Sequence, residues 1–235
     1  MNAFLLLRLR RSALVASCAW LLAIALACTV EEGDRASTGA CPEGETCSSD
    51  APDGLRFAGL ALGSVTSERL PATAVWGRQT ILVDGLGVSS ATVETSSAWF
   101  LTLSELDPDQ ASFVVSAVSP GDTLIRVVDR DGLLLDRVSL RTAAIARVDV
   151  ARIGDDDAVS IVPGERASLV VRLFDADGER VVDESLEITG EHVETISWDC
   201  FDVVVPADWD RGDELIVTAT AGDRRAHELL IPIVR

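Results

Sequence analysis

The chain of 235 residues contains no lysine and no tyrosine, and it has only two histidines, His192 and His227. Without lysine the protein cannot form a Schiff base through a side-chain amine, and without tyrosine it offers no phenolic acid to a reaction. Basic residues are scarce beside acidic ones, so the formal net charge is −18. Nucleic acids bind basic surfaces, and anionic lipids attract them. We therefore expect no nucleic-acid partner and attribute the charge to solubility.

Long uncharged runs are also missing, with one exception near the start of the chain. Ser12–Ala27 holds 16 residues without a charge, whereas a helix needs about 20 apolar residues to span a bilayer. The run follows Arg8, Arg10 and Arg11 and ends just before Cys28. A basic region, a short apolar run and small residues in this order are typical of a cleaved secretion signal. No later segment is as long without a charge, so we predict a signal peptide over 1–27 and no membrane span after it.

The residues Ala25-Leu26-Ala27 before Cys28 resemble the lipobox of bacterial lipoproteins. The resemblance implies cleavage before Cys28 and lipidation at that residue, which would anchor the remaining 208 residues to a membrane. Ala25 replaces the usual leucine, and Ala25-Leu26-Ala27 also suits ordinary signal peptidase, so simple secretion stays open. Cys18 is a rival lipidation site, but cleavage there would use up the apolar run too early. Thr29 stands where an aspartate favours inner-membrane retention, so the resemblance implies an outer-membrane lipoprotein, periplasmic or surface-facing.

The residues after the signal, 28–54, contain almost no bulky apolar side chains and many acidic or small ones. Such a segment cannot bury enough surface to order itself, which predicts a flexible acidic tether. Cys41 and Cys47 flank a turn-prone spacer in it, and in an oxidising compartment we predict that they form a small local disulfide. Cys200 stands alone in the C-terminal half, and we predict no partner for it.

From Leu55 onward, short β-type runs alternate with turn residues, and no helical periodicity is evident. The runs that alternate in steps of two include 113–117, 148–150, 201–205 and 214–219. Asp129-Arg130-Asp131-Gly132 and Asp175-Ala176-Asp177-Gly178 each separate two such runs, and we predict hairpin turns there. The pattern predicts an all-β fold.

Three motifs occur in both halves of this region in the same order. Gly77-Arg78-Gln79 matches Gly164-Glu165-Arg166, Val93-Glu94-Thr95 matches Val193-Glu194-Thr195, and Gly121-Asp122 matches Gly212-Asp213. These matches predict a duplicated domain of roughly 90 residues.

The size and strand pattern of each half resemble bacterial immunoglobulin-like domains of the surface-protein type, which implies two tandem β-sandwiches over 55–143 and 144–235. Neither half carries the Cys…Trp…Cys pattern of antibody domains, so we expect the inner faces alone to supply stability. We expect the large aromatic residues of the core or its rim to include Trp76, Trp99, Trp198 and Trp209.

Candidate catalytic residues are few. His192 or His227 with Cys200 could imitate a thiol nucleophile and its base, but no Gly-x-Ser-x-Gly motif surrounds a serine. Acidic pairs of the kind used for glycoside hydrolysis are inevitable among 38 acids and therefore carry no signal. We predict no catalytic residue and no cofactor.

Calcium is the ligand best suited to the acidic loops, because it prefers several carboxylate and carbonyl oxygens. The candidate residues are Asp155, Asp156, Asp157, Asp175 and Asp177, with Asp129, Asp131 and Glu179 as further oxygen donors. The segment from Asp175 fails as an EF-hand loop because Gly178 comes too early. Acidic turns that close hairpins explain the same residues without a metal.

We therefore expect a non-catalytic exported lipoprotein that displays two immunoglobulin-like modules at the cell envelope, for protein or glycan interaction or as a spacer. A calcium-stiffened adhesin and a small periplasmic enzyme are the alternatives. Fold alone does not decide among them.

Overall fold

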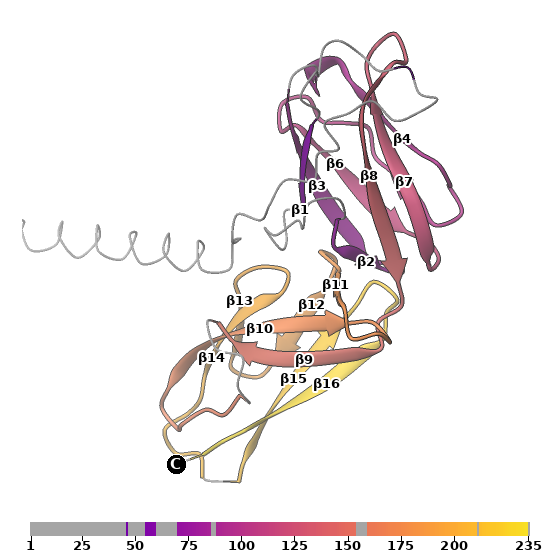
Figure 1. Ribbon diagram of the computed structural model, residues 1–235. Helices are drawn as coiled ribbons and strands as arrows, with labels where there is room; N and C mark the ends of the chain where they lie inside the picture. Colours follow the sequence, from indigo (N-terminus) through magenta and orange to yellow (C-terminus); the bar gives the residue numbers. More distant parts are fainter. Residues whose placement is uncertain are drawn as a thin grey trace, which may run out of the picture.

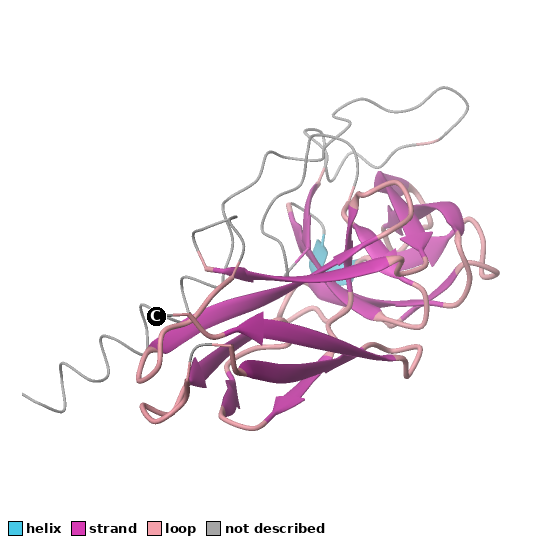
Figure 2. Cartoon of the chain, turned by 90° about the horizontal axis from the view of Figure 1, so that it is seen from below, coloured by secondary structure: helices cyan, strands magenta, loops and turns pink. Residues whose placement is uncertain are grey.

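The computed structural model describes Thr46 and residues 55–59, 70–85, 88–153, 159–210 and 212–234. In these residues it contains strands and one short 3-10 helix, η1 (Val88–Ser90), so the prediction of an all-β fold is confirmed (Figures 1 and 2). The predicted signal peptide and tether lie outside the described residues except for Thr46, whose carbonyl accepts a hydrogen bond from the Leu134 N–H at 3.0 Å. No helix in the described part of the chain is long and apolar enough to cross a membrane.

The strands up to Ala143 form two facing sheets, which we call the N-terminal sandwich. The first sheet has the order β1-β3-β6-β5, formed by β1 (Arg56–Gly59), β3 (Arg78–Asp84), β6 (Ser112–Ala117) and β5 (Leu101–Leu103). The second has the order β4-β7-β8-β2, formed by β4 (Thr92–Thr95), β7 (Gly121–Val128), β8 (Leu134–Ala143) and β2 (Ala72–Ala74).

The strands from Arg147 onward repeat this plan and form the C-terminal sandwich. One sheet has the order β9-β10-β14-β13, formed by β9 (Arg147–Arg152), β10 (Arg166–Phe174), β14 (Cys200–Val204) and β13 (Val193–Thr195). The other has the order β12-β15-β16, formed by β12 (Glu187–Gly190), β15 (Glu214–Thr220) and β16 (Ala226–Pro232). One further strand, β11 (Arg180–Val182), follows β10.

When β2 and β11 are left out and the remaining strands of each sandwich are numbered in chain order, strands 1, 2, 5 and 4 form one sheet and strands 3, 6 and 7 form the other. This is the strand arrangement of an immunoglobulin domain. Each also has a short segment parallel to its last strand: β2 pairs with β8 in the N-terminal sandwich, and Ile161 bridges Ile233 in the C-terminal one. The two halves are therefore copies of one fold.

Each sandwich has its own core, which is built from the inward-facing side chains at alternate positions along the strands. Phe113, Val115 and Ala117 of β6 face inward and are buried, as their alternation predicts. Phe201 and Val203 of β14 do the same in the second core. The largest fully buried side chains are phenylalanines, whereas Trp76 and Trp99, predicted for the core or its rim, are exposed and do not belong to the core. Trp198 and Trp209 are partly buried against the second core.

The sequence matches between the halves correspond only in part to the structure. The Gly77 and Gly164 motifs both lead into the second strand of a sandwich, and the Gly121 and Gly212 motifs both lead into the sixth. The match between Val93–Thr95 and Val193–Thr195 is wrong, because the first segment lies in β4 whereas the second is β13, the counterpart of β5.

The two predicted hairpin turns are closed in the same way by their first aspartate. Asp129 Oδ1 accepts the N–H groups of Asp131 and Leu133, each at 2.9 Å. Asp175 Oδ1 accepts those of Asp177 and Glu179, also at 2.9 Å. The glycine of each turn has φ near +80°, a conformation that glycine adopts without the cost other residues pay.

Candidate functional site

The two sandwiches are joined by one continuous sheet (Figure 1). Strand β11 leaves the C-terminal sandwich and pairs in parallel with β2, aligning Val181 with Ala72 and Val182 with Thr73. On its other side β2 pairs with β8, and β11 pairs with the end of β10. We call this contact between the sandwiches, formed by β2, β3, β8 and the β10–β11 hairpin, the joint.

Asp183, the residue after β11, is the most enclosed charged group of the joint, with no exposed surface. Its carboxylate accepts the Arg78 N–H at 3.2 Å from the N-terminal sandwich and the Gly222 N–H at 2.7 Å from the C-terminal one. Ser185 donates its N–H at 2.9 Å and its hydroxyl to the same carboxylate. A carboxylate with several such donors can remain buried. Asp183 thus ties backbone groups of both sandwiches together.

Two glycines allow the backbones to approach closely at this point. A Cβ at Gly77 would lie 2.7 Å from the carboxyl carbon of Asp183, and a Cβ at Gly222 would lie 2.1 Å from the carbonyl oxygen of Trp76. Larger residues would push the sandwiches apart.

Glu184 extends the same contact along β3. Its carboxylate accepts the N–H of Thr80 at 2.8 Å and the hydroxyl of Thr80 at 2.6 Å, while its own N–H donates to the Arg78 carbonyl at 2.8 Å. The side chain and backbone of one residue therefore bond to two successive outward positions of the neighbouring sandwich.

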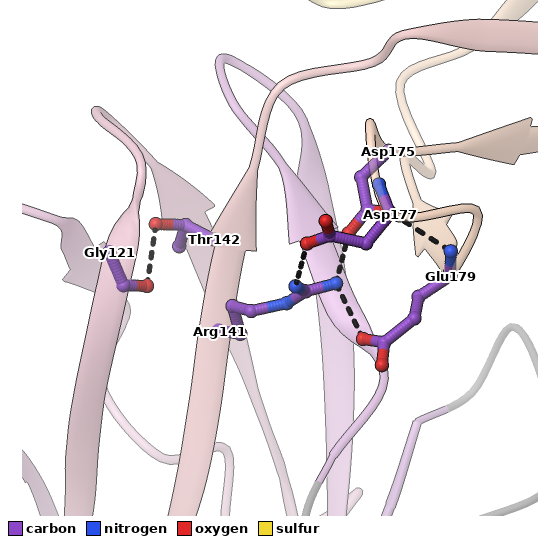
Figure 3. Close-up of polar contacts among 6 residues, drawn as sticks. All are labelled: Gly121, Arg141, Thr142, Asp175, Asp177 and Glu179. Atoms are coloured by element: carbon purple, nitrogen blue, oxygen red, sulfur yellow. Dashed lines mark hydrogen bonds and ion pairs between the residues drawn. The ribbon is translucent and has the colours of Figure 1, made fainter.

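The acidic turn of the β10–β11 hairpin surrounds Arg141 of β8 (Figure 3). The guanidinium donates to the Asp175 carboxylate, and it lies 2.7 Å from Glu179 Oε2 and 3.5 Å from Asp177 Oδ2. Arg141 is 17% exposed and the Asp175 side chain 5%, so this pair is shielded from water, whereas Asp177 and Glu179 are largely exposed. Charged groups interact more strongly when they are shielded.

Asp199 directly precedes β14 and is influenced by the charge of Arg180, the first residue of β11. Burial raises the pKa of its carboxyl to about 6, against the opposing effects of the Ser197 hydroxyl, which donates to it at 3.1 Å, and of the Arg180 charge. The neighbouring Val171 N–H donates to the Asp199 carbonyl at 2.8 Å. This is a titratable group next to the strand that joins the sandwiches.

The calcium candidates fall into two groups. Asp155, Asp156 and Asp157 lie outside the described residues. Asp175 and Asp177 lie in the joint, and both carboxylates interact with Arg141. Among the residues that the structure describes, no three His, Cys, Asp or Glu side chains gather as a metal site would require.

One prediction about the cysteines is wrong, and it concerns Cys200. Cys200 is disulfide-bonded, so the prediction that it has no partner is wrong, and it holds no free thiol to act as a nucleophile. His192 lies before β13 and contacts Trp209 edge to face with ring centroids 5.6 Å apart, while His227 lies in β16 of the opposite sheet. Cys28, Cys41 and Cys47 lie outside the described residues, and their roles stay predictions.

Two exposed tryptophans lie near the joint end of the N-terminal sandwich. Trp99 is 84% exposed and Trp76 is 59% exposed. Trp76 follows β2, and its carbonyl faces Gly222 of the other sandwich. Sequence reasoning missed that these residues are on the surface, and it also missed Arg141 and Asp183, which no local pattern distinguishes from other charged residues.

Fold and joint together define a pair of immunoglobulin-like β-sandwich modules, structurally similar to bacterial surface-layer and adhesin domains. Domains 5–6 of the S-layer protein SbsC match with 16% identity over 70% of this chain and 92% of that one, at a TM-score of 0.31. The Escherichia coli adhesin FdeC matches with 11% identity over 77% and 64% of the chains, at 0.27. SGBP-B of Bacteroides ovatus, in complex with a mixed-linkage heptasaccharide, matches with 15% identity over 73% and 45%, at 0.33.

Neither the comparison with protein-family models nor that with curated proteins yields a match. The likeness to solved structures concerns the fold, and at these TM-scores nothing about function follows from it.

Proposed function

We propose that this protein is a non-catalytic, exported lipoprotein that displays two rigidly joined immunoglobulin-like modules at the cell envelope. The modules would present an interaction surface for protein or glycan at a fixed orientation. The joint is the observation that supports this function best. Domains of one chain usually move relative to each other unless the interface is extensive. Here a shared sheet, a fully buried carboxylate and a shielded ion pair oppose such motion.

The membrane anchor of the proposal comes from the sequence. Cys28 would carry the acyl chains, and the acidic residues 28–54 would separate the modules from the bilayer. Each buried CH₂ of an acyl chain contributes about 0.8 kcal/mol, so several chains hold a protein stably. An outer-membrane location, periplasmic or surface-facing, follows from Thr29 after the cysteine, with secretion as the alternative if ordinary signal peptidase acts.

Metabolic labelling with a fatty-acid analogue tests the anchor. We expect the full chain to take up label, the Cys28→Ala variant to lose it, and the matched Cys18→Ala variant to keep it. Label that persists in Cys28→Ala would refute lipidation at this residue. Label that is lost in Cys18→Ala alone would move the anchor to Cys18.

A further inference from the structure

The two exposed tryptophans of the N-terminal sandwich are held by the same short segment of backbone. The Trp76 N–H donates to the Ala117 carbonyl at 3.1 Å, and the Ser119 hydroxyl donates to the Trp99 carbonyl at 2.6 Å. Only Val118 separates the two anchoring residues. The backbones that carry the two indoles are therefore neighbours, fixed to one strand end.

Trp76 also occupies a conformation that disfavours a bulky side chain. The turn Ala74–Gly77 is closed by the Gly77 N–H and the Ala74 carbonyl at 2.8 Å, and Trp76 has φ of 68° in its third position. Glycine or asparagine normally occupies a position with positive φ, and a bulky residue there is an outlier. Backbone strain of this kind is often found at ligand-binding sites. A tryptophan that is both strained and exposed contributes little to the core, so packing does not explain why it is there.

The backbone segments that carry the two rings are uncharged and rich in hydroxyl groups. The segments 74–77, 95–101 and 117–121 contain no charged residue, in a chain of which 25% is charged. Ser96 and Thr123 join their hydroxyls at 2.9 Å beside the Trp99 loop. Within its described residues, the N-terminal sandwich exposes no other large apolar side chain.

We propose that Trp76 and Trp99 form a platform for a neutral polysaccharide, which is the partner class that the displayed modules would engage. The electron-rich face of an indole attracts the slightly positive C–H groups on the flat face of a sugar ring, and the indole N–H can donate a hydrogen bond. A neutral polymer suits the uncharged segments that carry the two tryptophans, whereas an anionic one would be repelled by a protein with a net charge of −18. A protein partner would favour an apolar patch around the anchors, which specific interfaces of about 800 Å² per partner contain.

Affinity electrophoresis of the full chain in detergent tests the platform. Native gels would contain hydroxyethylcellulose, xyloglucan, galactomannan or amylopectin, with anionic alginate as the charged comparison. We expect at least one neutral polymer to retard the wild-type chain and alginate to leave its mobility unchanged. Trp99→Ala should weaken this binding at least tenfold.

Trp76→Asn separates binding from stability, because asparagine tolerates positive φ. We expect this variant to lose retardation while its thermal unfolding midpoint stays equal to or above that of the wild type. Leu230→Ala, which removes an exposed apolar side chain of the C-terminal sandwich, is the matched control and should be retarded like the wild type.

Retardation that survives in both tryptophan variants would overturn the platform. No retardation by any of the four neutral polymers would overturn the glycan assignment in favour of a protein partner. This inference rests on the proposed display function, yet the two fail separately, since fatty-acid labelling reports on Cys28 and retardation reports on the tryptophans.

Discussion

Asp199 shows how one buried carboxyl affects the stability of the joint region. In the unfolded chain an aspartate has its ordinary pKa near 3.8, and burial raises the pKa of Asp199 in the folded protein to about 6. Between these values the folded state binds more protons than the unfolded one, so the free energy of unfolding rises as pH falls through this window. Above about pH 6 the folded protein holds a desolvated charge and loses that contribution, which is about 3 kcal/mol for a difference of two pKa units.

Asp199→Asn should therefore be more stable than the wild type at pH 8, by about 1–3 kcal/mol, and this advantage should shrink steadily as the pH falls towards the ordinary aspartate pKa near 3.8. The reason is that asparagine keeps the shape of the side chain without a charge to desolvate. Urea denaturation between pH 4.5 and 8 measures this, with the exposed Glu228→Gln as the control. Parallel stability curves for Asp199→Asn and the wild type would refute the assigned pH dependence.

At the scale of elements, the β10–β11 hairpin has two roles. Its acidic turn is closed by Asp175 Oδ1, and Oδ2 of the same carboxylate interacts with Arg141 of the other sandwich. One side chain therefore shapes the turn and positions β11 beside β2.

Arg141→Met should loosen this hairpin, because methionine fills a similar space but leaves the shielded Asp175 carboxylate without its counter-ion. Removing one partner of a shielded ion pair destabilises a protein by about 3 kcal/mol. Hydrogen exchange of the backbone amides in Val181–Val182 and Thr73–Ala74 should accelerate. The control Arg130→Met removes an exposed arginine and should change neither the stability nor the hydrogen exchange of these amides. Unchanged protection of these amides in Arg141→Met would show that the ion pair does not hold the joint.

Much of each sandwich was predictable from sequence because burial follows strand alternation, as in 113–117 of β6, and because Asp-x-Asp-Gly is a strong turn signal. The joint was not. β11 has three residues, too few for a periodicity, and its pairing with β2 depends on a residue some hundred positions away.

The tryptophans were misassigned for a related reason. Size suggested the core or its rim, but phenylalanines are the largest fully buried side chains in both cores, and Trp76 and Trp99 are exposed. The Leu215-Ile216 run shows the same limit, since it repeats the letters of Leu124-Ile125 while Ile216 faces solvent and Ile125 faces the core.

At the scale of the whole molecule, we expect the continuous sheet to couple the two sandwiches into one cooperative unit. We expect a single calorimetric unfolding transition for the wild type, with calorimetric and van't Hoff enthalpies equal. Asp183→Ala should split this transition in two, because it leaves the partly buried N–H groups of Arg78 and Gly222 without acceptors, at a cost of about 1–3 kcal/mol each.

The matched control is Asp84→Ala, which removes an exposed carboxylate 3.8 Å from Arg56 and should keep the single transition. Two transitions in the wild-type protein would contradict the cooperative joint. One transition in Asp183→Ala at an unchanged midpoint would assign the coupling to the sheet alone.

The parallel direction of β2 and β8 has a mechanical consequence. The chain enters β2 at one end of their shared ladder and leaves β8 at the other, and Ile161 and Ile233 repeat this geometry in the C-terminal sandwich. A pull between the start of β2 and the end of β8 therefore loads these hydrogen bonds in shear, all at once, instead of unzipping them singly. Forced unfolding is governed by the unfolding rate. A protein fastened to a membrane at one end and held at the other would thus bear part of the tension through these parallel pairings.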